Sequence, residues 1–435
     1  MVGLVSVVVI AALVGLRLRA HEAPTVVAKT VDVAEESVAL EPTPATAEPT
    51  PSTGERPPVQ IITGKPFDST AETQATSASA SLRIQRVAEH APAGNSNASP
   101  QPADPTPSAA PSVPPTAPKA PVNLAGAGAV FPYPLYEDWF KNFHKVDADV
   151  QFQYQSIGSG GGIRQVLNGA VDFGATDIPM SDEQLKQAGS RILHVPTALR
   201  GVVPIYNVPG VTGEIKFNSD VLADIYLGKI VWWDDPAITT LNEGNNLPHE
   251  SIIVVHRSDG NGTTFLFTEY LSNVSDAWRS SAGVGASVKW PKGVGSKGEE
   301  GVGATVQQLD GAIGYVDFRF AEEQGLSYGP VQNSAGRFVK ASLERLTQAA
   351  ASIQVTPTDF RASITNAPGS DSYPIAGFTW LLVPIKPKSG PQGDAMIAFL
   401  GWMLDRGENM TTNLGYAPLP RNVSGEVKQL VAKIQ

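Results

Sequence analysis

The stretch Ile252-Ile-Val-Val-His-Arg-Ser-Asp-Gly-Asn-Gly-Thr-Thr264 carries three structural signals in succession. Residues 252–255 form a continuous apolar run, which is typical of a buried strand. A glycine-rich segment follows, and residues 264–272 then have the pattern of a helix. A strand that leads through a short turn into a helix is the repeating unit of α/β proteins.

Two other stretches repeat this event, namely Ala125-Gly-Ala-Gly-Ala-Val-Phe-Pro-Tyr-Pro134 and Gly158-Ser-Gly-Gly-Gly162. Each turn leaves unpaired N–H groups at a helix start, where the helix dipole is positive. Small residues allow an anion to approach this backbone closely. Any one turn alone is equally consistent with an ordinary tight turn, but three in one domain favour a site for a small oxyanion.

More specific motifs do not fit these turns. Phe131 stands where a dinucleotide fingerprint needs its third glycine, and the sequence has no Gly-Lys-Ser/Thr phosphate loop. The segment that starts at Asp259 resembles a calcium loop, but its twelfth position is Tyr270 instead of Glu.

Three charged residues lie beside the turns. Arg257 follows the buried strand, and Asp259, two residues later, is placed to hold its guanidinium, although a surface ion pair is the simpler alternative. Asp177 follows the apolar segment 171–175, where a capping role is the alternative. A carboxylate that faces an anion is favourable only when the ligand carries a proton, so Asp177 predicts selection of protonated oxyanions.

The rest of the body alternates in the same way. Strands are predicted at 150–154, 171–175, 312–316 and 379–384, and helices at 163–167 and 395–404. The alternation predicts an α/β fold with mostly parallel sheets, and its size favours two lobes. Trp232, Trp233, Trp290 and Trp380 are predicted to pack in the core.

Composition separates this body from the first 120 residues of the 435-residue chain. That segment has 17 of the 36 prolines and, in Phe67, one of the 32 aromatic residues. Residues 21–120 therefore cannot bury a core and are predicted to form a disordered linker rich in Pro, Thr, Ser and Ala. The mostly apolar run Val2–Leu16, which is shorter than a membrane-spanning helix, predicts a signal peptide or short membrane anchor in residues 1–20. We therefore expect export to the periplasm or cell surface.

Charge and residue types exclude several function classes. The formal net charge is −10, of which residues 121–435 carry −7, and this argues against a nucleic-acid partner. The absence of cysteine excludes disulfides, thiolate metal sites and cysteine nucleophiles. The six histidines have no metal-ligand spacing, and no Gly-x-Ser-x-Gly elbow is present. We expect no metal, no cofactor and no enzymatic activity.

The motifs together resemble those of the periplasmic phosphate-binding proteins of bacterial phosphate-specific ABC transporters. The resemblance covers residues 124–434 and rests on segments 126–132, 157–162, 171–177, 224–236, 257–263 and 291–315. It implies a two-lobed type II periplasmic-binding-protein fold with a hinge, in which residues 121–198 and 372–435 form lobe 1 and residues 199–371 form lobe 2. It also implies a monomer that captures inorganic phosphate between its lobes and delivers it to a membrane permease.

Matching positions imply the site. The implied phosphate ligands are Val130, Phe131, Ser159, Asp177, Arg257, Asn261, Gly262 and Thr263, with Asp259 and Gly160 behind them. The family usually has Thr at Val130 and Ser at both Asn261 and Gly160, which affects affinity more than ligand class. Three alternatives stay open: a receptor for sulfate or molybdate, a phosphatase or phosphoryl transferase, and a tethered surface protein that no longer serves transport.

Overall fold

The computed structural model describes residues 120–189, 191–354, 360–387 and 390–434. The predicted export segment and nearly all of the predicted linker lie outside these ranges. In chain order the elements are β1 (Val122–Gly128), α1 (Tyr133–His144), β2 (Val150–Ser156), α2 (Ser159–Leu167), β3 (Phe173–Thr176), α3 (Asp182–Gln187), β4 (Ile192–Asn207), α4 (Ser219–Tyr226), α5 (Pro236–Thr239), β5 (Ile253–Arg257), α6 (Gly262–Val274), α7 (Asp276–Ser281), β6 (Val294–Ser296), α8 (Gly298–Gln308), β7 (Ala312–Asp317), α9 (Phe318–Gln324), β8 (Val331–Gln332), β9 (Phe338–Val339), α10 (Leu343–Ala351), β10 (Ala376–Pro384), α11 (Pro391–Trp402), a π-helix (Met403–Gly407), α12 (Glu408–Thr411) and α13 (Arg421–Val431).

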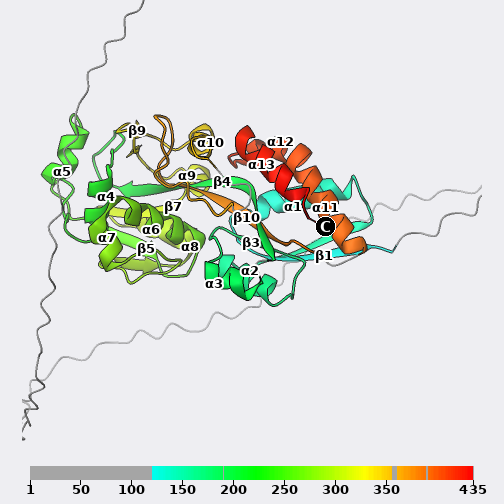
Figure 1. The fold of residues 1–435 in the computed structure, drawn as a ribbon. Helices are drawn as coiled ribbons and strands as arrows, with labels where there is room; N and C mark the ends of the chain where they lie inside the picture. Colours follow the sequence, from blue (N-terminus) through cyan, green and yellow to red (C-terminus); the bar gives the residue numbers. More distant parts are fainter. Residues whose placement is uncertain (1–119, 190, 355–359, 388–389, 435) are drawn as a thin grey trace, which may run out of the picture. The chain divides into compact units, whose positions relative to one another are not determined.

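Eight strands form one sheet in the order β2-β1-β3-β10-β4-β7-β5-β6 (Figure 1). The pairs β1–β2, β1–β3, β5–β6 and β5–β7 are parallel, whereas β10–β3, β10–β4 and β4–β7 are antiparallel. The α/β class is confirmed. The expected parallel pairing holds at the two ends of the sheet but not in its middle, where β4 and β10 run in opposite directions.

Strand β4 connects the two ends of the sheet. Residues 192–201 pair with β10, and residues 202–207 pair with β7. Thirteen consecutive residues of β4, from His194 to Tyr206, are buried, which explains why this long stretch of sequence is mostly apolar. A residue in the middle of β4 therefore touches elements from both ends of the sheet.

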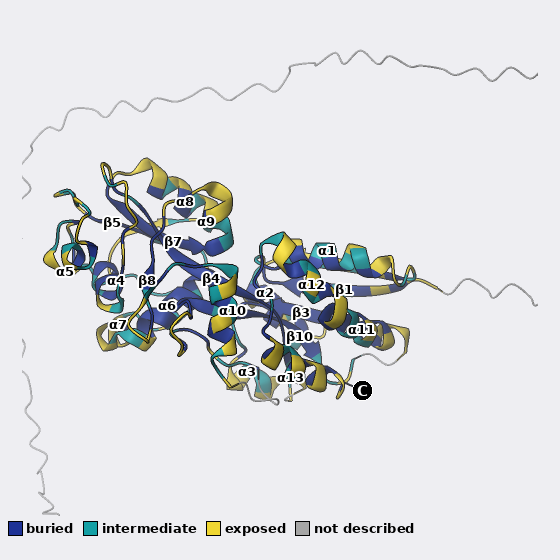
Figure 2. Cartoon of the chain, turned by 90° about the horizontal axis from the view of Figure 1, so that it is seen from above, coloured by how far each residue is buried: buried dark blue, intermediate teal, exposed yellow. Residues whose placement is uncertain are grey.

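The three predicted turn units are present. Strand β1 leads into α1, β2 leads through Gly158 into α2, and β5 leads into α6. Gly158 has a φ of +82° at the start of α2, a conformation that favours glycine. The inner strands of the sheet are largely buried, whereas the edge strands β2 and β6 are partly exposed, and the helices expose their outer faces (Figure 2). In the described residues no helix has the length and apolar character needed to cross a membrane.

The tryptophan prediction is only partly right. Trp233 and Trp380 are buried, and Trp290 packs against the core from a half-buried position. Trp232 is 41% exposed and stacks on the ring of His249 at 4.3 Å, so its placement in the core was wrong. Its neighbour Trp233 takes the interior position and donates its indole N–H to the Gly311 carbonyl.

Candidate functional site

A cleft of about 490 Å³ lies where the three turns meet. Its walls contain residues from the β1–α1 turn, from the start of α2, from the residue after β3 and from the β5–α6 turn. The sequence-predicted residues that line it are Val130, Phe131, Ser159, Asp177, Arg257, Asp259, Asn261, Gly262 and Thr263. Gly160, the remaining one, lies in the first turn of α2 and does not line the cleft.

Arg257 and Asp259 form a two-point ion pair on the α6 side of the cleft. Arg257 Nε donates to Asp259 Oδ1 at 2.9 Å, and Nη2 donates to Oδ2 at 2.6 Å. The Gly298 N–H adds a third bond to Oδ1 at 3.0 Å. The guanidinium lowers the pKa of Asp259 to about 2, so this carboxylate is ionised and fixes the orientation of Arg257.

The start of α6 combines a cap with a close approach. Asn261 Oδ1 accepts from the Thr264 N–H at 2.8 Å, and its amide donates to the Asp259 carbonyl at 2.7 Å, so this side chain orders the turn. A Cβ at Gly262 would lie 2.5 Å from the Asp177 Cβ, which leaves room for glycine alone. The N–H groups of Gly262 and Thr263 begin the helix and are free of intrahelical partners.

Ser159 connects the start of α2 to Asp177. The Asp177 N–H donates to Ser159 Oγ at 2.9 Å, and the Ser159 hydroxyl acts on the Asp177 carboxyl as a hydrogen-bond donor that lowers its pKa. Asp177 is buried, and burial raises the pKa of its carboxyl against the opposing effect of Arg200. Its Oδ1 atom has no hydrogen-bond partner within the described part of the chain.

A second arginine, Arg200 on β4, lies at the base of the cleft and was missed by the sequence analysis. Its Nη1 pairs with Asp177 Oδ2 at 2.9 Å, and its Nη2 pairs with Asp317 Oδ2 at 3.0 Å. The same Nη2 donates to Thr263 Oγ1 at 2.8 Å. The guanidinium also lies 4.6 Å from the ring centre of Phe131. Arg200 therefore links three parts of the cleft, namely Asp177 after β3, Asp317 at the end of β7 and Thr263 at the start of α6.

Two acidic residues of the cleft were also missed. Glu299, in the first turn of α8, accepts from Arg257 Nη1 and Thr263 Oγ1, both at 2.6 Å. Its other oxygen accepts from the Asp317 N–H at 2.9 Å. Asp317 ends β7, is buried, and lines the cleft, and its burial raises its pKa to about 7.

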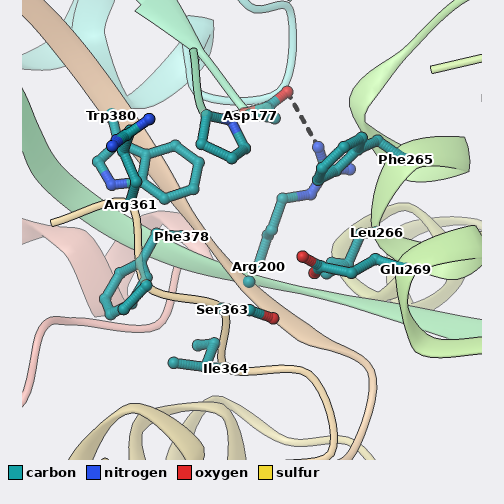
Figure 3. A pocket seen from close by; sticks show the side chains of 13 residues that line it. Asp177, Arg200, Phe265, Leu266, Glu269, Arg361, Ser363, Ile364, Phe378 and Trp380 are labelled. Atoms are coloured by element: carbon teal, nitrogen blue, oxygen red, sulfur yellow. Dashed lines mark ion pairs between the residues drawn. The ribbon is translucent and has the colours of Figure 1, made fainter. Parts of the chain in front are cut away.

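The Asp177–Arg200 pair also borders a second, smaller cavity of about 20 Å³ (Figure 3). Phe265, Leu266 and Glu269 of α6 and Phe378 and Trp380 of β10 line it. This volume holds about one water molecule, not an oxyanion. The larger cleft is therefore the place for a ligand, and the ion pair forms part of its floor.

Comparison with known proteins agrees with this architecture. A family model described as a PBP superfamily domain matches residues 104–406. The phosphate-binding protein PstS of Pasteurella multocida is 43% identical over 307 residues, which cover 70% of this chain and 88% of that protein. The PstS of Xylella fastidiosa strain Temecula1 is 42% identical over 313 residues, covering 72% and 84%. The chain belongs to the PstS family of phosphate-binding proteins.

A solved structure supports the fold independently of close sequence similarity. The phosphate-binding protein from Stenotrophomonas maltophilia matches 72% of this chain and 94% of its own, with a TM-score of 0.53 at 19% identity. The predicted two-lobed periplasmic-binding-protein fold of the PstS family is thus confirmed. The curated relatives are binding proteins by name, not enzymes.

Val130 lies at the edge of the cleft, and its side chain is 60% exposed. It lines the cleft without offering a hydroxyl group. Its neighbour Phe131 accepts a bond on its carbonyl from the Tyr416 hydroxyl at 2.8 Å, which holds the turn in place.

Proposed function

We propose that this protein binds inorganic phosphate in the 490 Å³ cleft and hands it to a membrane ABC permease after export. The observation that carries the proposal is the convergence of Arg257, Thr263 and two helix starts on one cleft in a member of the PstS family. These are donors for an oxyanion, fixed before the ligand arrives. The function is binding rather than catalysis, and a monomer suffices because the cleft is built within one chain.

Each donor has a defined source in this proposal. Arg257 supplies charge, and the N–H groups of Phe131, Gly262 and Thr263 supply neutral donors. The hydroxyl groups of Ser159 and Thr263 complete the set. Asn261 contributes mainly by capping α6, because its amide is already bonded within the turn.

Asp177 is proposed to select a protonated oxyanion. Its Oδ2 is held by Arg200, and its unpartnered Oδ1 is an acceptor without a donor. Hydrogen phosphate can supply a proton to that atom, whereas sulfate at neutral pH cannot. Sulfate would place its own lone pairs against a buried carboxylate, which is costly because neither partner can donate.

We further infer that release to the permease involves movement of the two lobes about β4 and β10. The boundaries proposed from sequence, 198/199 and 371/372, fall within β4 and just before β10. Binding-protein folds of this kind close around ligands by hinge motion. We also propose that residues 1–20 direct the export of the protein.

Titration calorimetry with phosphate and sulfate tests the function. We expect phosphate binding and a preference over sulfate of roughly 10⁴, because a site built for one hydrogen bond rejects an analogue that lacks it. Asp177→Asn should reduce this preference by at least an order of magnitude. Asp317→Asn is the matched comparison, since it removes the other carboxylate partner of Arg200 and should preserve the preference.

Equal affinity of the unaltered protein for the two anions would remove the role of Asp177 and favour a general oxyanion receptor. Absence of phosphate binding would instead favour a surface protein that no longer serves transport. Hydrolysis of a phosphomonoester would contradict the assignment as a binding protein.

A further inference from the structure

The donors that the proposed function assigns to phosphate are engaged by a carboxylate of the protein itself. Glu299 Oε1 accepts simultaneously from Arg257 Nη1 and Thr263 Oγ1, at 2.6 Å each. Its Oε2 accepts from the Asp317 N–H at 2.9 Å. Glu299 thus presents two oxygen atoms to one cation, one hydroxyl and one backbone amide, which is the bonding pattern of a bound oxyanion.

The geometry points to Glu299 as an internal occupant of the phosphate site that the ligand must displace, and therefore as a residue that sets phosphate affinity. This inference rests on the proposed function. It identifies Glu299 as a competitor for the donors and not as a ligand of phosphate.

Donor availability requires the displacement. A threonine hydroxyl has a single hydrogen, and that of Thr263 is donated to Glu299 because its oxygen already accepts from Arg200 Nη2. Three of the five guanidinium donors of Arg257 are bonded to carboxylates. Phosphate can take the Thr263 hydrogen and the Arg257 Nη1 donor only after Glu299 has released them.

Charge leads to the same conclusion. Arg200 and Arg257 are surrounded by Asp177, Asp259, Asp317 and Glu299, and the other charged residues that line the cleft are the ion pair Arg319–Glu323 and the acid Glu300. Adding a phosphate dianion while Glu299 remains bound would place like charges against each other in a partly buried space. Departure of Glu299 removes one negative charge at the point where the new anion enters.

The position of Glu299 allows it to leave. Its side chain is 20% exposed, compared with 2% for Arg200, and it lies in the first turn of α8 at the cleft wall. Asp259 keeps its two bonds to Arg257 when Glu299 departs, so the guanidinium remains oriented for the incoming anion. Of the three donors that Glu299 releases, phosphate takes those of Arg257 and Thr263, and the Asp317 N–H loses its acceptor.

The opposite role is a permanent clamp that positions Arg257. A clamp and a competitor predict opposite effects of removing the carboxylate, because loss of a clamp weakens binding whereas loss of a competitor strengthens it. The neighbour Glu300 provides the control. It also lines the cleft and carries the same charge, but no bond joins it to Arg257 or Thr263 among the described residues.

The experiment is titration calorimetry of the full chain with inorganic phosphate, for the unaltered protein and for Glu299→Ala, Glu299→Gln and Glu300→Gln. We expect Glu299→Ala to bind phosphate about tenfold more tightly, since donors in a charge-assisted bond become free. Glu299→Gln keeps an acceptor oxygen but loses the charge, and should bind severalfold more tightly. Glu300→Gln should stay within about twofold of the unaltered protein, because it changes only the general field.

Thermal unfolding shows which variants fold. If Glu299→Ala does not fold, Glu299→Gln still tests the inference, because the glutamine amide oxygen can accept from the Asp317 N–H. Equal or weaker phosphate binding by the folded Glu299 variants overturns the inference and leaves the proposed function intact. An equal gain in Glu300→Gln also overturns it, because general charge would then explain the effect. Failure of all four proteins to bind phosphate contradicts the proposed function itself.

Discussion

At the scale of single residues, the cleft is governed by how two arginines share four carboxylates. Arg257 pairs with Asp259 through Nη2 and with Glu299 through Nη1. Arg200 is held between Asp177 and Asp317 with 2% of its side chain exposed. Removing one member of such a buried group leaves an uncompensated charge, so the site is sensitive to single changes.

Val130→Thr adds a hydroxyl group at the edge of the cleft, at a position where the family resemblance implies threonine. We expect phosphate affinity to rise by about tenfold, because a hydrogen bond to a charged ligand contributes about 1.5–3 kcal/mol and only part of this is retained at an exposed edge. Titration calorimetry measures the gain. Val130→Ala is the control, since it removes the apolar methyl groups without adding a donor, and an equal gain there would show that loss of the apolar side chain and not the new hydroxyl is responsible.

The sequence predicted some residues of the cleft and missed others. Asp177 and Arg257 were found because each lies beside a recognisable turn, Thr263 was implied by the family resemblance, and the structure brings all three to one cleft. Arg200 gave a signal that was not used, since an arginine within the apolar run of a central strand must find buried partners. Glu299 gave none, because its sequence neighbours suggest only an acidic first helical turn, and its contacts with Thr263 and Asp317 are 36 and 18 residues away.

At the scale of elements, local patterns predicted the units but not the direction of the central strands. Each glycine-rich turn connects a strand to the next helix, so its signal lies within about ten residues. The antiparallel pairing of β4 with β10 joins residues almost 200 positions apart, and no local pattern encodes it. The exposed position of Trp232 was missed for a related reason, since two adjacent tryptophans cannot both face the same core.

The C-terminal helices contain a half-buried acid that makes stability depend on pH. Glu408, at the start of α12, accepts from the Leu419 N–H through Oε2 at 3.3 Å, and its Oε1 has no partner in the described residues. Burial raises its pKa to about 8, from an ordinary value of 4.5. Between these two values the unfolded chain is ionised and the folded one is protonated, so stability falls as pH rises.

Glu408→Gln removes this titration. We expect the variant and the unaltered protein to have similar stability near pH 5, and the variant to become more stable by up to about 4 kcal/mol near pH 9. Denaturant unfolding at pH 5, 7 and 9 measures the difference. The exposed Glu183 supplies a control variant, Glu183→Gln, which makes the same change of side chain at the surface. A constant difference for Glu408→Gln would show that this carboxyl ionises at its ordinary value.

At the scale of the whole molecule, one continuous sheet joins the parts that build the cleft. The sixteen residues of β4 pair with β10 and then with β7, and Arg200 lies where the two pairings meet. Within the described part of the chain, the cleft residues range from Val130 to Glu323 and come from both halves of the sheet. Ligand binding should therefore stabilise both halves of the sheet at once, because neither half contains the whole site.

We expect a single thermal transition that phosphate shifts as a unit. At a phosphate concentration 100 times the Kd, binding to the folded state alone adds about 2.7 kcal/mol, which raises Tm by several degrees. The chain without residues 1–119 should show the same shift, and sulfate at equal concentration should have little effect on either protein. Scanning calorimetry provides the measurement. Two transitions, of which phosphate moves only one, would mean that the halves of the sheet unfold separately and that β4 does not couple them. Loss of the phosphate-induced shift in the truncated chain would place part of the site in the first 119 residues.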